Sequence, residues 1–421
     1  MKLIAASIAA VLLLVAVVGT QVKIDARPEK KDMVAANPFH RLPPSQYMGE
    51  YIASMLLGGL RAVAIDYLWI QFMKAERARQ WVEVNALLEI ISNLEPSFSE
   101  IWNHLAWARA YNIAAAQESR EDRWLWVKGG LESMDKAIAR NPGSDKLWFY
   151  KGYMHYHRLP QEQYLMDRFL EEMGEDSYGV AALTLAHAIE VAQARGKDNT
   201  VPPCDGMMQD AFNKWAFERL RRGQYERATQ TLQQGHDTYL RLMTGRPVGS
   251  MNQNNNRLFL DLLPVFALEE TLAGQNRAGD PGAAQTSEKL LGMYVSLEQA
   301  YVFCRGVERR IVELSAGSLA RALALAREGR AAEGSELFGR TAGVLYEMLG
   351  EKTRGSAQHF WIDMTSFARG VEQALALEAA GKPAEAAAKY DDIIEAQRNA
   401  LPGDAPQWTL LMQRAAELRK P

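Results

Sequence analysis

The chain has 421 residues, of which 48% are hydrophobic and 24% are charged, and its formal net charge is -3. This composition is typical of a folded protein with a core and argues against a mainly disordered chain. No cluster of lysine and arginine stands out, so the charge gives no electrostatic reason to expect a nucleic-acid partner. The length is compatible with two or three compact domains or with one extended array of repeats.

An apolar stretch near the N-terminus runs from Leu3 to Gly19 without a charge. Its length lies at the lower limit for a bilayer-spanning helix and slightly above that of a usual signal-peptide core. We expect residues 1–19 to be a signal-anchor that stays in the membrane through residues 3–19, with the rest of the chain in the periplasm of a bacterial envelope. A cleaved signal peptide stays open as an alternative. A cytoplasmic orientation also stays open, because basic residues follow the apolar stretch.

Residues 20–46 are rich in proline and charge, which is typical of a linker that cannot bury enough apolar surface to order itself. A second apolar region, residues 51–73, is interrupted by Arg61 and Asp66. Each charge near the centre of a bilayer costs about 2.5 to 3.5 kcal/mol on insertion scales. The second region is therefore predicted to be a buried or membrane-adjacent helix rather than another span.

Helical spacing dominates the rest of the chain. Apolar residues recur three and four positions apart, as in Trp81, Val84, Leu88 and Ile91, and few β-branched residues alternate with polar ones. The sequence therefore predicts an all-α protein.

Three prolines are each followed by a tryptophan six residues later, which indicates that one helix stops and another starts in the same way each time. The three pairs are Pro96 with Trp102, Pro142 with Trp148, and Pro402 with Trp408.

The segments LLEIISNLEPSFSEIWNHLAWA and KGGLESMDKAIARNPGSDKLWFYKGY resemble the tetratricopeptide repeat, a helix-turn-helix unit of 34 residues. With Trp102 at the tryptophan position of the family, Leu105 and Ala106 take the leucine and small-residue positions. In the second copy Trp148 and Gly152 match, whereas a lysine replaces the leucine. The two prolines are 46 residues apart, so the first unit is longer than the family's repeat.

Three later segments resemble the inner turn of the same family, in which a glycine closes the first helix and small residues let the second helix pack closely. They are GQYERA with Gly223 and Ala228, GRAAEG with Gly329 and Gly334, and GKPAEA with Gly381 and Ala386, preceded by Ala216, Ala322 and Ala374. The resemblance implies a tetratricopeptide-like α-solenoid of stacked helical hairpins.

The resemblance also divides the chain. We expect N-terminal repeats over residues 47–158, a divergent helical region with loops over 159–315, and C-terminal repeats with a capping helix over 316–421. Within the divergent region, the glycine, proline and asparagine content of residues 245–256 and 275–285 predicts exposed loops.

Repeats of this family hold peptides or partner proteins on the inner faces of their first helices. Carrying those positions onto the two clearest copies gives an aromatic groove, and the alternative is that these residues are packed core. Tyrosine and tryptophan supply large contact areas at low entropic cost, which favours recognition. The predicted partner-binding residues are Asn103, Trp107, Tyr111, Phe149, Tyr153, Tyr156 and His157.

The sequence gives little evidence of a catalytic site. His155 and His157 are two positions apart on a predicted helix, so they point in different directions and make a poor metal pair. No phosphate-binding loop, nucleophile elbow or metalloprotease motif is present, and we expect no cofactor and no metal. Cys204 and Cys304 could pair in an oxidising compartment, but their spacing does not establish a pair, and two separate thiols are the favoured interpretation.

The sequence therefore predicts a non-enzymatic, membrane-tethered scaffold that binds a protein or peptide partner, with an envelope complex as the expected setting. The alternative is an enzyme or small-ligand binder whose site lies in the divergent region, residues 159–315.

Overall fold

The structure, a computed structural model, describes residues 61–96, 98–196, 201–243, 250–301, 305–347, 357–396 and 405–420. All regular structure in these ranges is helical, which confirms the all-α prediction for the part of the chain that they cover. The expected membrane anchor and the proline-rich linker, residues 3–19 and 20–46, lie outside the described residues. Among the helices inside them, none combines the length and the apolar character needed to cross a bilayer.

The chain divides into two compact units, Met1–Ala211 and Phe212–Pro421, and each is described by itself. The helices of the first unit are α4 (Arg61–Arg77), α5 (Trp81–Leu94), α6 (Ser99–Trp107), η4 (Ala108–Ile113), α7 (Arg120–Arg140), α8 (Asp145–Tyr153), η5 (Met154–Arg158), η6 (Leu159–Gln161), α9 (Gln163–Met173) and α10 (Ser177–Ala194). Helix α11 (Val201–Arg221) contains the boundary. The second unit continues with α12 (Tyr225–Met243), α13 (Ser250–Ala278), α14 (Ala283–Ala300), α15 (Arg305–Arg327), α16 (Ala331–Glu347), α17 (Ala357–Ala379), α18 (Pro383–Ala396) and α19 (Pro406–Leu418).

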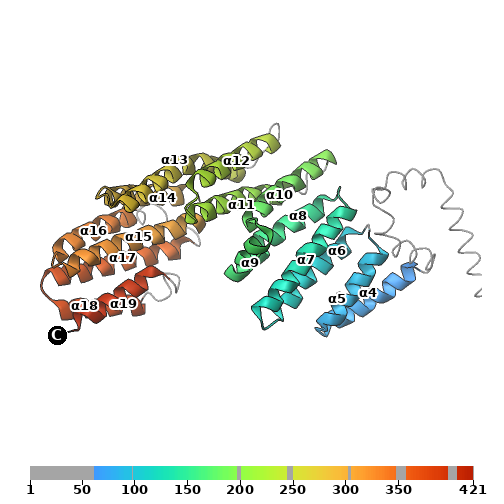
Figure 1. Ribbon diagram of the computed structural model, residues 1–421, viewed down its shortest axis with the longest axis horizontal. Helices are drawn as coiled ribbons and strands as arrows, with labels where there is room; N and C mark the ends of the chain where they lie inside the picture. The colour runs from blue at the N-terminus through green and yellow to red at the C-terminus, as the bar shows by residue number, and fades with distance from the viewer. Residues whose placement is uncertain are drawn as a thin grey trace, which may run out of the picture. The chain divides into compact units, whose positions relative to one another are not determined.

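Neighbouring helices in the chain are also neighbours in space within each unit (Figure 1). In the first unit α4 packs on α5, α5 on α6, α6 on α7, and α7 on α8, while α8 packs on α10. In the second unit the same succession runs from α12 to α19, and α14 and α15 also contact the next helix but one. The hydrophobic core of each unit is therefore built from successive contacts between neighbouring helices.

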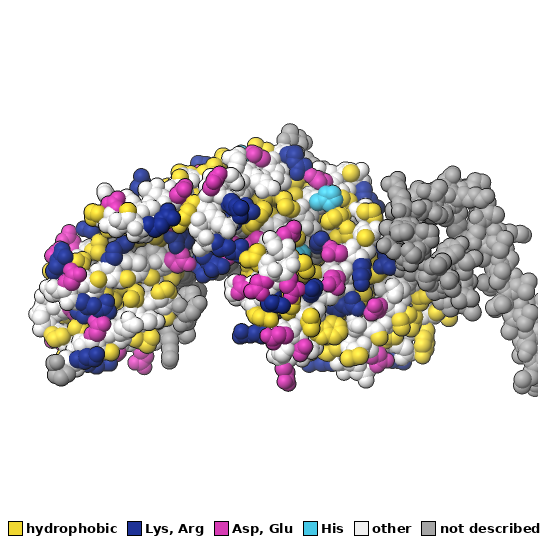
Figure 2. Space-filling model, in the orientation of Figure 1, with side chains coloured by type: hydrophobic (Ala, Val, Ile, Leu, Met, Phe, Trp, Pro, Cys, Tyr) yellow, Lys and Arg dark blue, Asp and Glu magenta, His cyan; other side chains and the backbone are white. Residues whose placement is uncertain are grey.

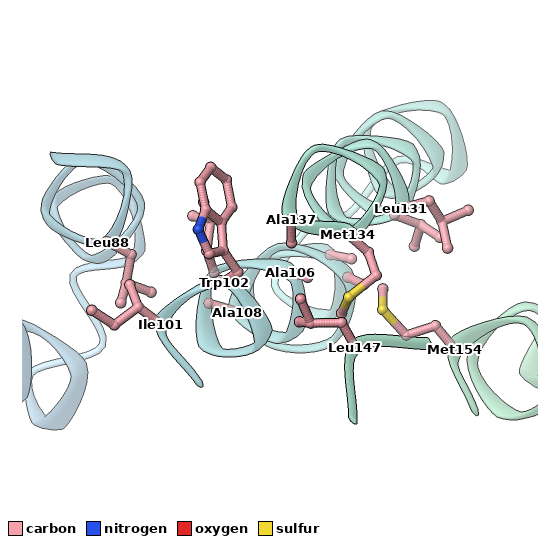
Figure 3. Packing of buried hydrophobic residues seen from close by; sticks show 14 of the residues in the cluster. Leu88, Ile101, Trp102, Ala106, Ala108, Leu131, Met134, Ala137, Leu147 and Met154 are labelled. Carbon is pink, nitrogen blue, oxygen red and sulfur yellow. The ribbon is translucent and has the colours of Figure 1, made fainter. Parts of the chain in front are cut away.

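Figure 3 shows part of the core of the first unit. Leu88 of α5 and Ile101 of α6 lie close together, and Met134 of α7 and Leu147 of α8 make a similar contact further along. All four side chains are at most 1% exposed. Spacings of three and four residues place such side chains on the inward face of each helix, as the sequence predicts.

The predicted inner turns are present in the second unit. Gly223, Gly329 and Gly381 each follow a helix with φ between +71° and +80°, a conformation that side chains other than glycine rarely adopt. Beyond one of these turns, a Cβ on Gly334 of α16 would lie 2.5 Å from the Ala322 carbonyl oxygen of α15. The small residue therefore lets the two backbones cross at short range, as predicted.

The loop predictions are wrong in part. Residues 250–256 belong to α13 rather than to a loop, and residues 244–249 lie outside the described part. Of residues 275–285, only 279–282 connect α13 and α14. Asparagine and glycine cost at most about 1 kcal/mol each in a helix, and tertiary packing outweighs that cost here. Asn256 Oδ1, for example, lies 3.0 Å from His236 Nδ1 of α12.

Candidate functional site

Two helical segments of the first unit carry all the predicted partner-binding residues. The first consists of α6 and η4, residues 99–113, and the second of α8 and η5, residues 145–158; we call them the strip helices. The two segments lie side by side: Lys146 Nζ of the second is 3.0 Å from Glu100 Oε1 of the first, and α6 contacts α8. These two residues are 46 positions apart, the same separation as between Pro96 and Pro142.

The proline–tryptophan spacing fixes how each strip helix begins. Trp102 Nε1 donates to the Pro96 carbonyl oxygen at 3.1 Å, and Trp148 Nε1 donates to the Pro142 carbonyl oxygen at 2.9 Å. An indole has a single N–H donor, which needs an acceptor when the ring is partly buried. A tryptophan six residues after the proline reaches back over the first turn and supplies that bond. Trp408 is buried at the start of α19, and Pro402 lies outside the described residues.

Glycines bring the neighbouring helices close to the rear of the strip helices. A Cβ on Gly130 of α7 would lie 2.8 Å from the Ala106 carbonyl oxygen, and a Cβ on Gly152 would lie 2.6 Å from Leu185 Cγ of α10. Ala106 and Gly152 are the small residues of the two repeat-like segments. Through these close contacts α7 and α10 support the side of the strip helices that faces the core.

Each strip helix changes from α to π geometry at a corresponding place. The π-helices η4 and η5 begin at Ala108 and Met154, again 46 residues apart. A π segment is rare and interrupts the regular hydrogen-bond pattern, so carbonyls there become available to other donors. Arg158 Nε donates to the Ala110 carbonyl oxygen at 2.7 Å, and Ser177 Oγ donates to the His155 carbonyl oxygen at 2.6 Å.

Five of the seven predicted residues form one cluster of rings. Trp107 stacks on Tyr111 with ring centroids 4.0 Å apart and planes 14° apart. On the second strip helix Tyr153 stacks on His157 at 5.0 Å and 18°. Across the helices, Trp107 lies 6.2 Å from Tyr153 and Tyr111 lies 6.0 Å from His157. Phe149 contacts Tyr153 at 6.2 Å and extends the cluster by one turn.

We call these five rings the ring strip. None of the five is fully buried: Trp107 is 36% exposed, His157 is exposed, and the other three are half-buried. Tyr111 also packs against the hydrophobic core of the unit. The strip is therefore a surface feature that rests on the core.

The two remaining predicted residues lie beside the ring strip. Asn103 is half-buried one turn before Trp107 on the same helix. Tyr156 is half-buried and donates its hydroxyl hydrogen to Asp210 Oδ2 of α11 at 2.5 Å. The Tyr156 hydroxyl is thus directed to another helix rather than to the ring strip.

The polar atoms of the ring strip are joined by long hydrogen bonds. Tyr111 Oη and Gln161 Nε2 each lie 3.3 Å from His157 Nδ1, beyond the usual 2.7 to 3.2 Å range. Burial raises the pKa of Tyr111 well above its usual value, and the nearby Tyr153 raises it further. The Tyr111 hydroxyl is therefore protonated at neutral pH and can donate a hydrogen bond.

His155 and His157 have different surroundings, as their spacing predicts. His155 is 3% exposed and meets the Phe169 ring edge-on at a centroid distance of 5.0 Å. Burial lowers the pKa of His155 to about 3, with a smaller contribution from the Lys151 charge, so the ring is neutral at pH 7. Its Nδ1 atom is buried without a hydrogen-bond partner. His155 therefore belongs to the core, whereas His157 belongs to the surface.

Sequence reasoning missed Arg158 as part of this arrangement. Its side chain is 4% exposed, and its guanidinium carbon lies 5.9 Å from the centre of the Tyr111 ring. Its other nitrogens face Gln161 and Glu162 at 3.4 Å. Arg158 directly follows His157 in the sequence, and the carbonyl that it binds, that of Ala110, lies in the π segment η4. A π segment has no residue pattern of its own, so the sequence carries no signal for this contact.

The divergent region contains a buried polar cluster in the second unit. Arg310 of α15 binds Glu269 of α13 through two bonds of 2.8 and 2.7 Å, and Tyr294 of α14 donates to the same carboxylate at 2.9 Å. These groups satisfy one another, which is typical of a structural network. Glu298 differs, because both its carboxylate oxygens are buried without a hydrogen-bond partner. Burial and the nearby Glu308 raise the pKa of Glu298 to about 8.

Cys204 is buried as a free thiol, and burial raises its pKa to about 12, so it is not a reactive thiolate at neutral pH. Cys304 lies outside the described residues. Comparison with models of known protein families and with curated protein sequences found no match.

Proposed function

We propose that the chain is a non-enzymatic scaffold of the tetratricopeptide type that holds a partner protein or peptide against the ring strip. The observation that carries this proposal is the cluster of five partly exposed rings on two adjacent helices. Large aromatic side chains that remain at the surface are the residues in which binding energy concentrates at protein interfaces.

The repeat assignment is supported by the regularity of the first unit. The proline–tryptophan bond, the small residue behind the helix and the π segment recur with a separation of 46 residues. The turn glycines and the close crossing at Gly334 support the same packing principle in the second unit. Stacked helical hairpins cover each other's apolar faces and leave a continuous outer surface for binding.

The membrane tether is proposed from the sequence of residues 3–19. Helix α4 adds support, because Val63, Tyr67 and Ile70 follow one of its faces and are 63%, 60% and 47% exposed. An exposed apolar face of this kind is compatible with a position close to a membrane or to a partner in it. We place the repeats in the periplasm, as part of an envelope complex.

The proposal is tested by co-purification from detergent-solubilised membranes. A Trp107→Ala, Tyr153→Ala double variant removes two central rings from the strip. The matched control is a Leu125→Ala, Leu183→Ala double variant, which removes two exposed apolar side chains, 63% and 47% exposed, from α7 and α10. We expect a defined set of proteins to bind the wild type and the control but not the ring variant.

The competing function would give a different pattern. If the same proteins bind all three forms, the ring strip is not the binding surface. If no protein binds and a small metabolite raises the melting temperature instead, a ligand site in residues 159–315 is favoured over the scaffold. Circular dichroism of the ring variant must match that of the wild type for the comparison to count.

A further inference from the structure

The charged lysine, arginine, aspartate and glutamate side chains of the strip helices are used in ion pairs with one another or with neighbouring segments. Every lysine, arginine, aspartate and glutamate in residues 99–113 and 145–158 takes part in an ion pair. The pairs are Glu100 with Lys146, Arg109 with Glu89, Asp145 with Arg195, Lys151 with Asp135, and Arg158 with Glu162. Over the face shown in Figure 2, basic and acidic side chains are likewise intermixed rather than separated into fields of one sign.

A surface whose charges are paired in this way gives little electrostatic attraction to a charged partner. An acidic or basic segment gains affinity when it meets unpaired charges of the opposite sign. Here it would have to compete with the existing pairs, and its own charges would lose water when they approach the rings. Phosphopeptides and acidic tails are bound by clusters of arginine, which the strip helices lack.

The ring strip offers aromatic surface and two hydrogen-bonding side chains, Tyr111 and His157, instead. The Tyr111 hydroxyl and the His157 ring nitrogen form their mutual bond at 3.3 Å, so a better-placed partner group can replace it at small cost. A helical partner has satisfied its backbone groups internally, whereas an extended segment exposes N–H and C=O groups that need partners. The Tyr111 hydroxyl and the His157 ring nitrogen can serve as such partners for an extended backbone.

We infer that the ring strip recognises an uncharged, extended peptide segment, held by aromatic contact and by hydrogen bonds to Tyr111 and His157. This inference rests on the proposed partner-binding function and specifies its ligand class. It predicts affinity that is nearly independent of salt, because no ion pair forms or breaks on binding.

The test is a selection of random short peptides displayed on phage against the purified protein, with the Trp107→Ala, Tyr153→Ala variant used to remove strip-independent binders. An enriched peptide is then synthesised, and its Kd is measured by fluorescence anisotropy at low and high NaCl. We expect enriched sequences without net charge and rich in proline or aromatic residues. We also expect a change in Kd of less than about twofold over a tenfold rise in salt.

A Tyr111→Phe variant keeps the ring and removes only the hydroxyl. We expect it to weaken binding about fivefold, as the loss of one hydrogen bond would. Enrichment of charged sequences whose affinity falls steeply with salt would overturn the inference and leave the partner-binding function standing. If no peptide depends on the rings, the proposed function itself fails at this surface.

Discussion

His155 should make the protein sensitive to mild acid. Its imidazole is 3% exposed, and its pKa is lowered from 6.5 to about 3. Below pH 6.5 the unfolded chain binds a proton at this residue while the folded chain does not, so stability falls as the pH drops from 6.5 towards 3. One pH unit corresponds to about 1.4 kcal/mol, and pH 5 lies 1.5 units below 6.5, so acidification from pH 7 to pH 5 should cost about 2 kcal/mol.

A His155→Leu variant removes the titrating ring with a side chain of similar volume. At pH 7 its free energy of unfolding should lie within about 1.5 kcal/mol of that of the wild type, because such replacements are generally tolerated in cores. Between pH 7 and pH 5 it should lack the loss of about 2 kcal/mol that the wild type shows.

Urea denaturation followed by tryptophan fluorescence at several pH values measures both quantities. His187→Leu is the control, because it removes a histidine whose side chain is 46% exposed rather than buried. The reasoning is refuted if His155→Leu and the wild type lose the same stability on acidification, or if the control removes the loss as well.

Three further predictions concern other buried groups and helix contacts. The pKa of Glu298 is raised from 4.5 to about 8, so its contribution to stability is largest below pH 4.5 and is lost as the pH rises towards 8. Glu298→Gln removes the titrating group, so it should flatten this pH dependence and raise the melting temperature at pH 7. Gly152→Ala should destabilise the protein by about 1 to 3 kcal/mol, whereas Gly143→Ala, with nothing within 4 Å of its added Cβ, should stay within about 0.5 kcal/mol in the same urea assay. Trp148→Phe should lower the free energy of unfolding by about 1 kcal/mol through loss of the indole bond to Pro142. Trp126 of α7 is also partly buried against the core, and Trp126→Phe in the same assay should have the smaller effect if that bond is the cause.

Local backbone rules account for what could be predicted from the sequence. A glycine such as Gly223 after an apolar-periodic segment predicts a left-handed turn, because other residues rarely adopt that conformation. The resemblance to the tetratricopeptide repeat likewise implied small residues at Ala106 and Gly152, and the structure places both at close helix contacts. The proline–tryptophan separation is visible in the sequence, although the hydrogen bond that explains it is not.

Non-local geometry accounts for the rest. The pairing of Tyr111 with His157 depends on two helices 46 residues apart in the chain lying side by side. Arg158 binds a carbonyl of the π segment η4, on the other strip helix, and local residue preferences do not indicate that contact. The loop prediction for residues 250–256 was wrong because local propensity was outweighed by the packing of α13 on α12.

The central claim is that the ring strip contacts the partner, and hydrogen–deuterium exchange of the purified complex tests it most directly. With a bound partner, backbone amides of residues 103–111 and 149–157 should exchange more slowly than in the free protein, while those of α12 to α19 should be unchanged. Protection confined to other helices, with residues 103–111 and 149–157 unaffected, would contradict the account.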